Sequence, residues 1–151
     1  MAVDQALVDA AIDLAHTRFA DQPWSGAAAL RLDNGAILTS TGPDAPNAAA
    51  SLCHETGALC EAFKLNRKVV ASVSVTAAEN SGDYWILAPC GICQERLFAY
   101  GPDVEVGVPE PTDPRRWHTL RLRDVQPHWF ARVFPGQQWP TDDRDRPARR
   151  A

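Results

Sequence analysis

The sequence predicts an α/β protein, a three-layer α/β/α sandwich in which a mixed five-stranded sheet carries helices on both faces. Helical and strand-like patterns follow one another in the order helix, strand, strand, helix, strand, strand, helix, strand. The Asn34-Gly35 pair between two short apolar runs is a strong signal for an antiparallel hairpin. The length of 151 residues fits one domain with a sizeable core.

The helices are predicted from apolar periodicity. The first is expected at 4–19, where Leu7, Ala11, Leu14 and their apolar neighbours recur at three- and four-residue spacing. It ends before Pro23, because the residue that precedes a proline is pushed out of the helical region. Further helices are expected at 52–65 and 90–100, and a short helix or turn at 125–134.

The strands are predicted from short runs of apolar and β-branched residues that are bounded by turn residues. The hairpin strands 27–32 and 36–40 come first, and a loop rich in Pro, Gly and Asn follows them at 41–47. The remaining strands are expected at 69–75, 84–87 and 104–108, with 117–122 as a candidate for one more at the end of the sheet.

Composition and charge narrow the classes of partner. A formal net charge of -4 argues against nucleic acid, whose binding requires clustered Lys and Arg, so a small polar substrate is expected. The first 16 residues carry acids among apolar residues and do not predict a signal peptide. No apolar run approaches the ~18 residues of a membrane span, so we expect a cytoplasmic protein without a membrane partner. The charged, proline-containing end predicts a domain at 1–135 and a disordered tail at 136–151.

Two short motifs carry the chemistry. Cys53-His54-Glu55 and Pro89-Cys90-Gly91-Ile92-Cys93 each lie at the start of a predicted helix. The N–H groups and the positive dipole end of a helix start stabilise an anion such as a thiolate. Three cysteines beside a glutamate suit a catalytic zinc site, which takes three protein ligands and leaves the fourth position open. Cys53, Cys90 and Cys93 are therefore the predicted Zn²⁺ ligands, and Glu55 is the predicted acid and base.

The Cys-x-x-Cys pair alone leaves other interpretations open. It is also found in thiol-disulfide oxidoreductases and in structural zinc modules that have no catalytic role. His54 is adjacent to Cys53, so on a helix it points about 100° away and is expected to line the pocket or to pack. Cys60 lies two turns beyond Cys53, about 10 Å along the axis, and is expected to be a buried small residue.

These motifs resemble those of the cytidine deaminase family, specifically the type with small subunits and three cysteine ligands, which includes the blasticidin S deaminases. The likeness extends beyond the metal motifs. Residues 26–30 are similar to the family's Val-Gly-Ala-Ala-Leu strand, the turn 33–35 follows as expected, and residues 124–130 resemble the family's C-terminal stretch. Roughly residues 4–130 are covered.

The resemblance implies a cytidine deaminase-like fold and hydrolytic deamination of a cytosine nucleoside, that is, of cytidine, deoxycytidine or a modified cytidine. Zinc would activate water for attack on C4, Glu55 would transfer the protons, and the uracil form and ammonia would leave. It also implies a homotetramer. The residues expected to contact the substrate are Trp24, Asp44, Asn47, His54 and Ala88.

The departures from the family pattern surround the pocket. Members that act on cytidine usually carry Asn-x-Glu-Asn before the first ligand to hold the ribose 3′-hydroxyl, whereas this chain has Gly-Pro-Asp-Ala at 42–45. We therefore expect weaker discrimination between sugars, with a blasticidin S-type or other modified cytosine compound as the alternative substrate. The family's arginine next to the catalytic Glu or the last ligand is replaced by Thr56 or Gln94, and Arg96 is the candidate to offset the thiolate charge.

Overall fold

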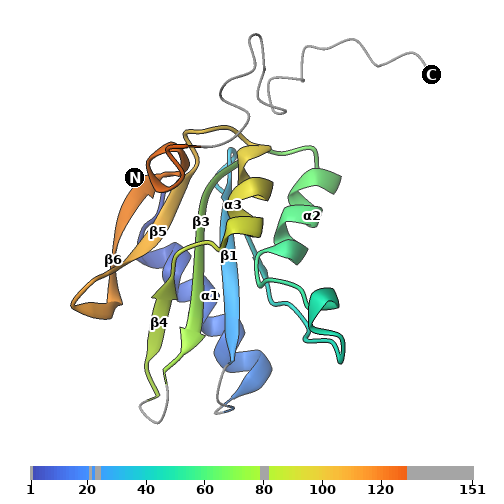
Figure 1. The fold of residues 1–151 in the computed structure, drawn as a ribbon, viewed down its shortest axis with the longest axis vertical. Helices are drawn as coiled ribbons and strands as arrows, with labels where there is room; N and C mark the ends of the chain where they lie inside the picture. The colour runs from blue at the N-terminus through green and yellow to red at the C-terminus, as the bar shows by residue number, and fades with distance from the viewer. Residues whose placement is uncertain (1, 21, 23–24, 79–81, 129–151) are drawn as a thin grey trace.

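The computed structural model describes residues 2–20, 22, 25–78 and 82–128 as three layers around one mixed sheet (Figure 1). The sheet lies in the middle, with α1 on one face and α2 and α3 on the other. The predicted α/β/α sandwich is therefore confirmed. The elements follow in chain order as α1 (Gln5–Phe19), β1 (Gly26–Leu32), β2 (Ile37–Ser40), η1 (Ala48–Ala50), α2 (Thr56–Lys64), β3 (Val69–Ala77), β4 (Tyr84–Leu87), α3 (Gly91–Phe98), β5 (Glu105–Glu110), β6 (Asp113–Arg121) and α4 (Leu122–Val125).

The sheet has the order β2-β1-β3-β5-β6, with β4 paired to β3 outside this path. The pairing of β3 with β5 is parallel, and the other pairings are antiparallel. One edge of β3 is covered by β1 along its length. Its other edge is divided, because Ala71 and Ser72 pair with β5 whereas 74–77 pair with β4.

The core has two parts, one on each face of the sheet. Alternate residues of β1 point to opposite faces, as the strand period requires. Ala28 and Leu30 pack with α2 and α3, whereas Ala27 and Ala29 pack with α1. Both faces of the central strands are thus buried. The contacts on the face that carries α2 and α3 hold these two helices against the sheet.

The expected hairpin is present. β1 and β2 pair across the turn at 33–35, and Gly35 has a φ of 86°, a conformation that favours glycine. Within the described residues the sheet contains six strands rather than five, because the candidate strand at 117–122 is present and begins earlier, at Asp113. The first half of this strand is polar, so a search for apolar runs does not detect it. It lies at the edge of the sheet and pairs with a neighbouring strand on one side only.

The second helix begins later than expected, at Thr56 rather than near Leu52. The Leu52 N–H donates to the carbonyl of Pro43, so this segment packs against the loop after β2. A Cβ on Gly42 would overlap the carbonyl oxygen of Leu52, which explains why the loop needs glycine at that position.

Two expectations fall outside the described residues. The predicted domain boundary at 135 and the tail at 136–151 lie beyond residue 128, and so does most of the helix or turn expected at 125–134, of which α4 covers the start. None of the helices in the described ranges has the length and apolar character that crossing a bilayer requires.

Candidate metal centre

Three thiols from two helix starts meet at one end of the sheet. Cys53 lies in the segment before α2, Cys90 immediately precedes α3, and Cys93 is in the first turn of α3. Their Sγ atoms all lie within 4.8 Å of one another, and the Sγ atoms of Cys53 and Cys90 are 3.4 Å apart. This separation is far longer than the ~2.05 Å of a disulfide bond, and all three cysteines are free thiols.

The donor set fits a tetrahedral metal ion. Two thiolates at about 2.3 Å from a shared zinc ion at the tetrahedral angle would be about 3.8 Å apart. The Cys53–Cys90 separation of 3.4 Å and the upper bound of 4.8 Å for all three pairs are both close to this value, so binding requires only small side-chain adjustments. Among the described residues no fourth His, Cys, Asp or Glu joins the group. Three ligands leave one position open, as in catalytic rather than structural zinc sites.

Burial and charge act differently on the three thiols. Burial raises the pKa of Cys93, and the nearby negative charge of Glu55 raises it further. The pKa of Cys53 is also raised, chiefly by burial. For Cys90, burial is outweighed by hydrogen bonds from the backbone N–H of Cys93, the Cys53 side chain and the backbone N–H of Ile92, so its pKa is lowered. The helix start thus favours the thiolate at Cys90, whereas Cys93 needs a cation to become one.

Glu55 lies beside the thiol cluster. It is the last residue before α2 and is only 4% exposed. One oxygen, Oε2, accepts a hydrogen bond from the Cys93 thiol over 3.2 Å. A buried carboxylate at this distance from one thiol can exchange protons with a group bound in the open position.

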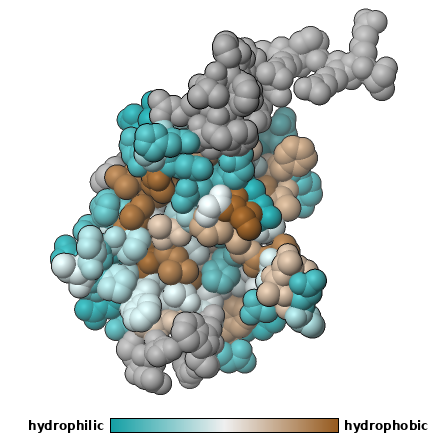
Figure 2. Space-filling view, in the orientation of Figure 1, coloured by the Kyte–Doolittle hydropathy of each residue, from teal (hydrophilic) through white to brown (hydrophobic). Residues whose placement is uncertain are grey.

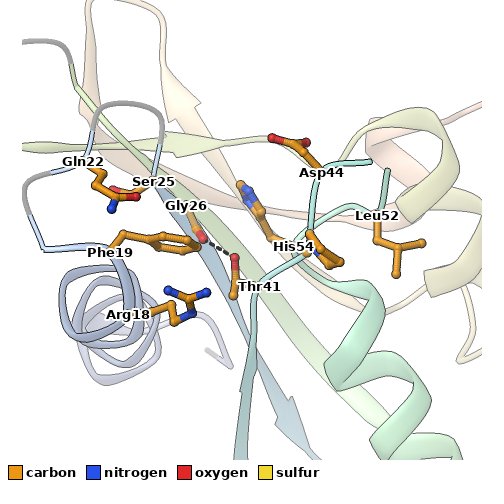
Figure 3. Close-up of a pocket in the computed structure, with 11 residues that line it drawn as sticks. Arg18, Phe19, Gln22, Ser25, Gly26, Thr41, Asp44, Leu52 and His54 are labelled. Carbon is orange, nitrogen blue, oxygen red and sulfur yellow. Dashed lines mark hydrogen bonds between the residues drawn. The ribbon is translucent and has the colours of Figure 1, made fainter. Parts of the chain in front are cut away.

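A cavity of about 500 Å³ adjoins the segment that carries Cys53 and Glu55, because His54, which stands between them in the chain, lines it (Figure 3). Its walls come from the end of α1, the start of β1, the loop after β2 and the segment before α2. Two residues expected to contact substrate, Asp44 and His54, line it. Arg18 and Phe19 also line it, with the Arg18 guanidinium 4.9 Å from the centre of the Phe19 ring. Neither residue is predicted from the sequence as part of a site, because both belong to the ordinary end of an amphipathic helix.

The other expected substrate residues are placed differently. Asn47 caps the short helix η1, where its Oδ1 accepts from the N–H of Ala49, and it does not line the described cavity. Ala88 is exposed and follows β4 directly, two residues before Cys90. Trp24 lies outside the described residues.

Arg96 connects the two helices that carry the thiols. Its Nη1 donates a hydrogen bond to Oγ1 of Thr56 over 2.7 Å. Because Thr56 follows Glu55 directly, this bond brings a cation from α3 to the start of α2. The Gln94 side chain makes a different contact, since its amide donates a hydrogen bond to the carbonyl of Pro89 over 2.7 Å.

A three-layer sandwich that gathers three thiols and a buried carboxylate at two helix starts defines a metal-binding enzyme. Comparison with solved structures identifies its relatives. The cytidine deaminase of Bacillus anthracis is 37% identical over 84% of this chain and 89% of that one, with a TM-score of 0.75. The cytidine deaminases of Burkholderia pseudomallei (21% identity, 83% of this chain and 98% of that one, TM-score 0.63) and Mycobacterium leprae (19%, 80% and 97%, 0.58) share the fold.

The chain belongs to the cytidine deaminase family, as its identity to the Bacillus anthracis enzyme shows. No protein-family profile matches the sequence, and no curated protein matches it significantly.

Proposed function

We propose that this enzyme removes the exocyclic amine of a cytosine nucleoside by zinc-dependent hydrolysis. One observation carries the proposal: three Sγ atoms lie within 4.8 Å of one another, with the buried carboxylate of Glu55 3.2 Å from one of them. That arrangement supplies three ligands, an open position and a proton carrier, which is what a zinc deaminase requires. The identity to a cytidine deaminase supports a cytosine nucleoside as the substrate.

In this proposal Cys53, Cys90 and Cys93 hold Zn²⁺ as thiolates. When bound, zinc serves as a Lewis acid that activates water as a nucleophile at neutral pH. Glu55 accepts a proton from that water and protonates N3 of the ring, which makes C4 electrophilic. As the water oxygen bonds to C4, Glu55 takes up the second proton of that water and delivers it to the amine, and the C4–N bond breaks, so that water and the nucleoside become ammonia and the uracil form. Free thiols need a reducing compartment, and we propose the cytoplasm as the site of action.

The test combines metal analysis with an ammonia assay. Purified protein is expected to contain about one zinc per chain and to release ammonia from at least one of cytidine, deoxycytidine, cytosine, blasticidin S and substituted cytosines. A thiol-disulfide oxidoreductase would contain no zinc and would cycle Cys90 and Cys93. A noncatalytic zinc module would hold the metal and release no ammonia from any compound.

Arg96 is proposed to offset the charge of three thiolates on one dication. Replacing Arg96 with glutamine is expected to lower zinc affinity by about 10- to 100-fold, the usual range for partners that surround the ligands. Competition with a chromogenic chelator measures this. Arg96→Lys keeps the charge and should retain most of the affinity, and Thr56→Val removes only the hydrogen-bond partner. Unchanged affinity in Arg96→Gln would show that the charge is offset elsewhere.

We also propose that the enzyme assembles as a homotetramer. Several large apolar side chains are exposed, among them Phe63 at 83% and Ile92 at 60%. Figure 2 shows apolar surface over the region that α3 and β4 occupy in Figure 1. Ile92 lies between two of the proposed ligands, so contacts between subunits would adjoin the metal centre.

Light scattering at micromolar concentration is expected to give four chains per particle. Phe63→Glu and Ile92→Glu are expected to weaken assembly, because a charge in an apolar interface loses its hydration. Lys64→Glu changes an exposed neighbour on α2 and serves as the control. A monomeric wild-type protein with full activity would contradict the proposal.

A further inference from the structure

The His54 imidazole forms part of the cavity wall and is held there by the start of β1. A Cβ on Gly26 would overlap Cε1 of His54 and would lie 2.8 Å from both ring nitrogens. Only glycine at position 26 therefore leaves room for the ring in this orientation. The backbone is fixed as well, because the His54 carbonyl accepts from Oγ of Ser40 over 2.5 Å. Figure 3 shows the ring between Gly26 and Asp44.

The two ring nitrogens have different surroundings. Nδ1 lies 3.4 Å from Oγ of Ser74, and that hydroxyl donates its hydrogen to the carbonyl of Ala27 over 3.5 Å. A hydroxyl has one hydrogen, so in a neutral ring Nδ1 carries the proton and donates to Ser74. Nε2 then presents a lone pair, and no hydrogen bond joins it to another described residue.

The cavity offers space for the part of a substrate that does not react. The proposed ligands and Glu55 are not among the residues that line it. His54 stands between Cys53 and Glu55 in the chain, and it lines the cavity whereas neither of these neighbours does. A base positioned for attack at C4 must reach Glu55, and its sugar is then left for the cavity. Asp44, which lines the same cavity, is also an acceptor of hydrogen bonds.

We propose that Nε2 of His54 accepts a hydrogen bond from a sugar hydroxyl of the nucleoside and makes His54 a specificity-determining residue. This inference rests on the proposed function. The sequence alone predicts weak discrimination between sugars, because residues 42–45 lack the family's Asn amide. The imidazole beside that loop supplies a polar contact that the loop lacks. Gly26 is the matching partner, since any side chain there would displace the ring.

The experiment compares kcat/KM for cytidine with kcat/KM for its 2′-deoxy and 3′-deoxy analogues. The wild type is expected to favour cytidine over at least one analogue by about tenfold or more, as one hydrogen bond to a partly buried group allows. His54→Ala and His54→Asn should lose this preference, mostly through slower use of cytidine. His54→Gln should keep most of it, because the Gln side chain reaches the position of Nε2 whereas Asn reaches only that of Nδ1.

Gly26→Ala tests the geometry without removing the imidazole, and it should behave like His54→Ala. Unchanged preference in His54→Ala and His54→Asn would overturn the inference, as would a wild type that does not distinguish cytidine from either analogue. Zinc content, measured for each variant, should stay at the wild-type value. A variant that loses zinc would assign His54 to the metal centre instead of the sugar and would likewise overturn the inference.

A second readout separates this inference from the proposed function. Calorimetry measures the binding of uridine and of the same deoxy analogues of uridine, which requires no turnover. If the zinc-loaded wild type releases no ammonia from any nucleoside, the proposed function fails. The uridine series still tests His54 in that case, because loss of the preference for uridine in His54→Ala supports the contact and an unchanged preference overturns it.

Discussion

Replacing Glu55 with glutamine is expected to abolish turnover while leaving the metal in place, because an amide keeps the shape of the group but cannot carry protons. General acid and base catalysis typically contributes about 10²- to 10⁴-fold to the rate, and Glu55 is assigned both roles. The bond to Cys93 shows how close the carboxylate lies to the thiol cluster. Steady-state kinetics with cytidine and metal analysis of the same sample measure the two effects.

The matched control is Glu61→Gln, which makes the same chemical change on the exposed side of the same helix. It should retain activity and metal. A Glu55→Gln variant with more than about a tenth of the wild-type kcat would rule out Glu55 as the acid and base. Such a loss of activity is smaller than even the smallest loss expected for general acid and base catalysis.

Loss of any one of the three thiols is expected to remove metal and activity together. Two thiolates cannot replace the three ligands that a catalytic zinc site takes from the protein. The effect should be largest for Cys93→Ala, because Cys93 is fully buried and its thiol hydrogen-bonds to Glu55, which would be left without that partner. Metal per chain should fall from about one to near zero, measured by mass spectrometry of the metal content.

Cys60→Ala provides the control, because Cys60 lies in α2, outside the cluster. The expectation that Cys60 is buried is wrong, since its side chain is exposed. It should keep both zinc and activity. The ligand assignment would be wrong if Cys60→Ala lost zinc while Cys53→Ala kept it.

Local sequence patterns predict most of the fold. The Asn34-Gly35 turn, the strand at 84–87 and the helix ending at Phe19 are each determined by neighbouring residues, so they agree with the structure. The start of α2 depends on a contact between Leu52 and Pro43, which no local pattern shows. The sixth strand is similar, because its first residues are polar and become a strand only by pairing with β5.

The candidate site likewise combines features that the sequence predicts with features that it does not predict. The spacing of the three cysteines predicts that they meet, since both motifs open helices on one face of the sheet. The wall of the cavity is formed by residues far apart in the sequence, such as Phe19, Gly26 and His54, and periodicity contains no information on their contact. One feature of the sequence does point to the contact between Gly26 and His54. The chain has Gly26 where the similar family strand has Val, and the smaller residue leaves room for the His54 ring.

The divided edge of β3 has a consequence for the lifetime of the bound metal. Cys90 is tethered to the sheet through β4, a strand of four residues, whereas Cys93 is anchored in the core. Short peripheral strands open at a lower free energy than the central elements of a domain. A fluctuation that detaches β4 therefore loosens the segment on one side of Cys90 while β1, β3 and both helices stay folded. Metal exchange is then governed by local opening, and it can be fast in a protein whose global unfolding is slow.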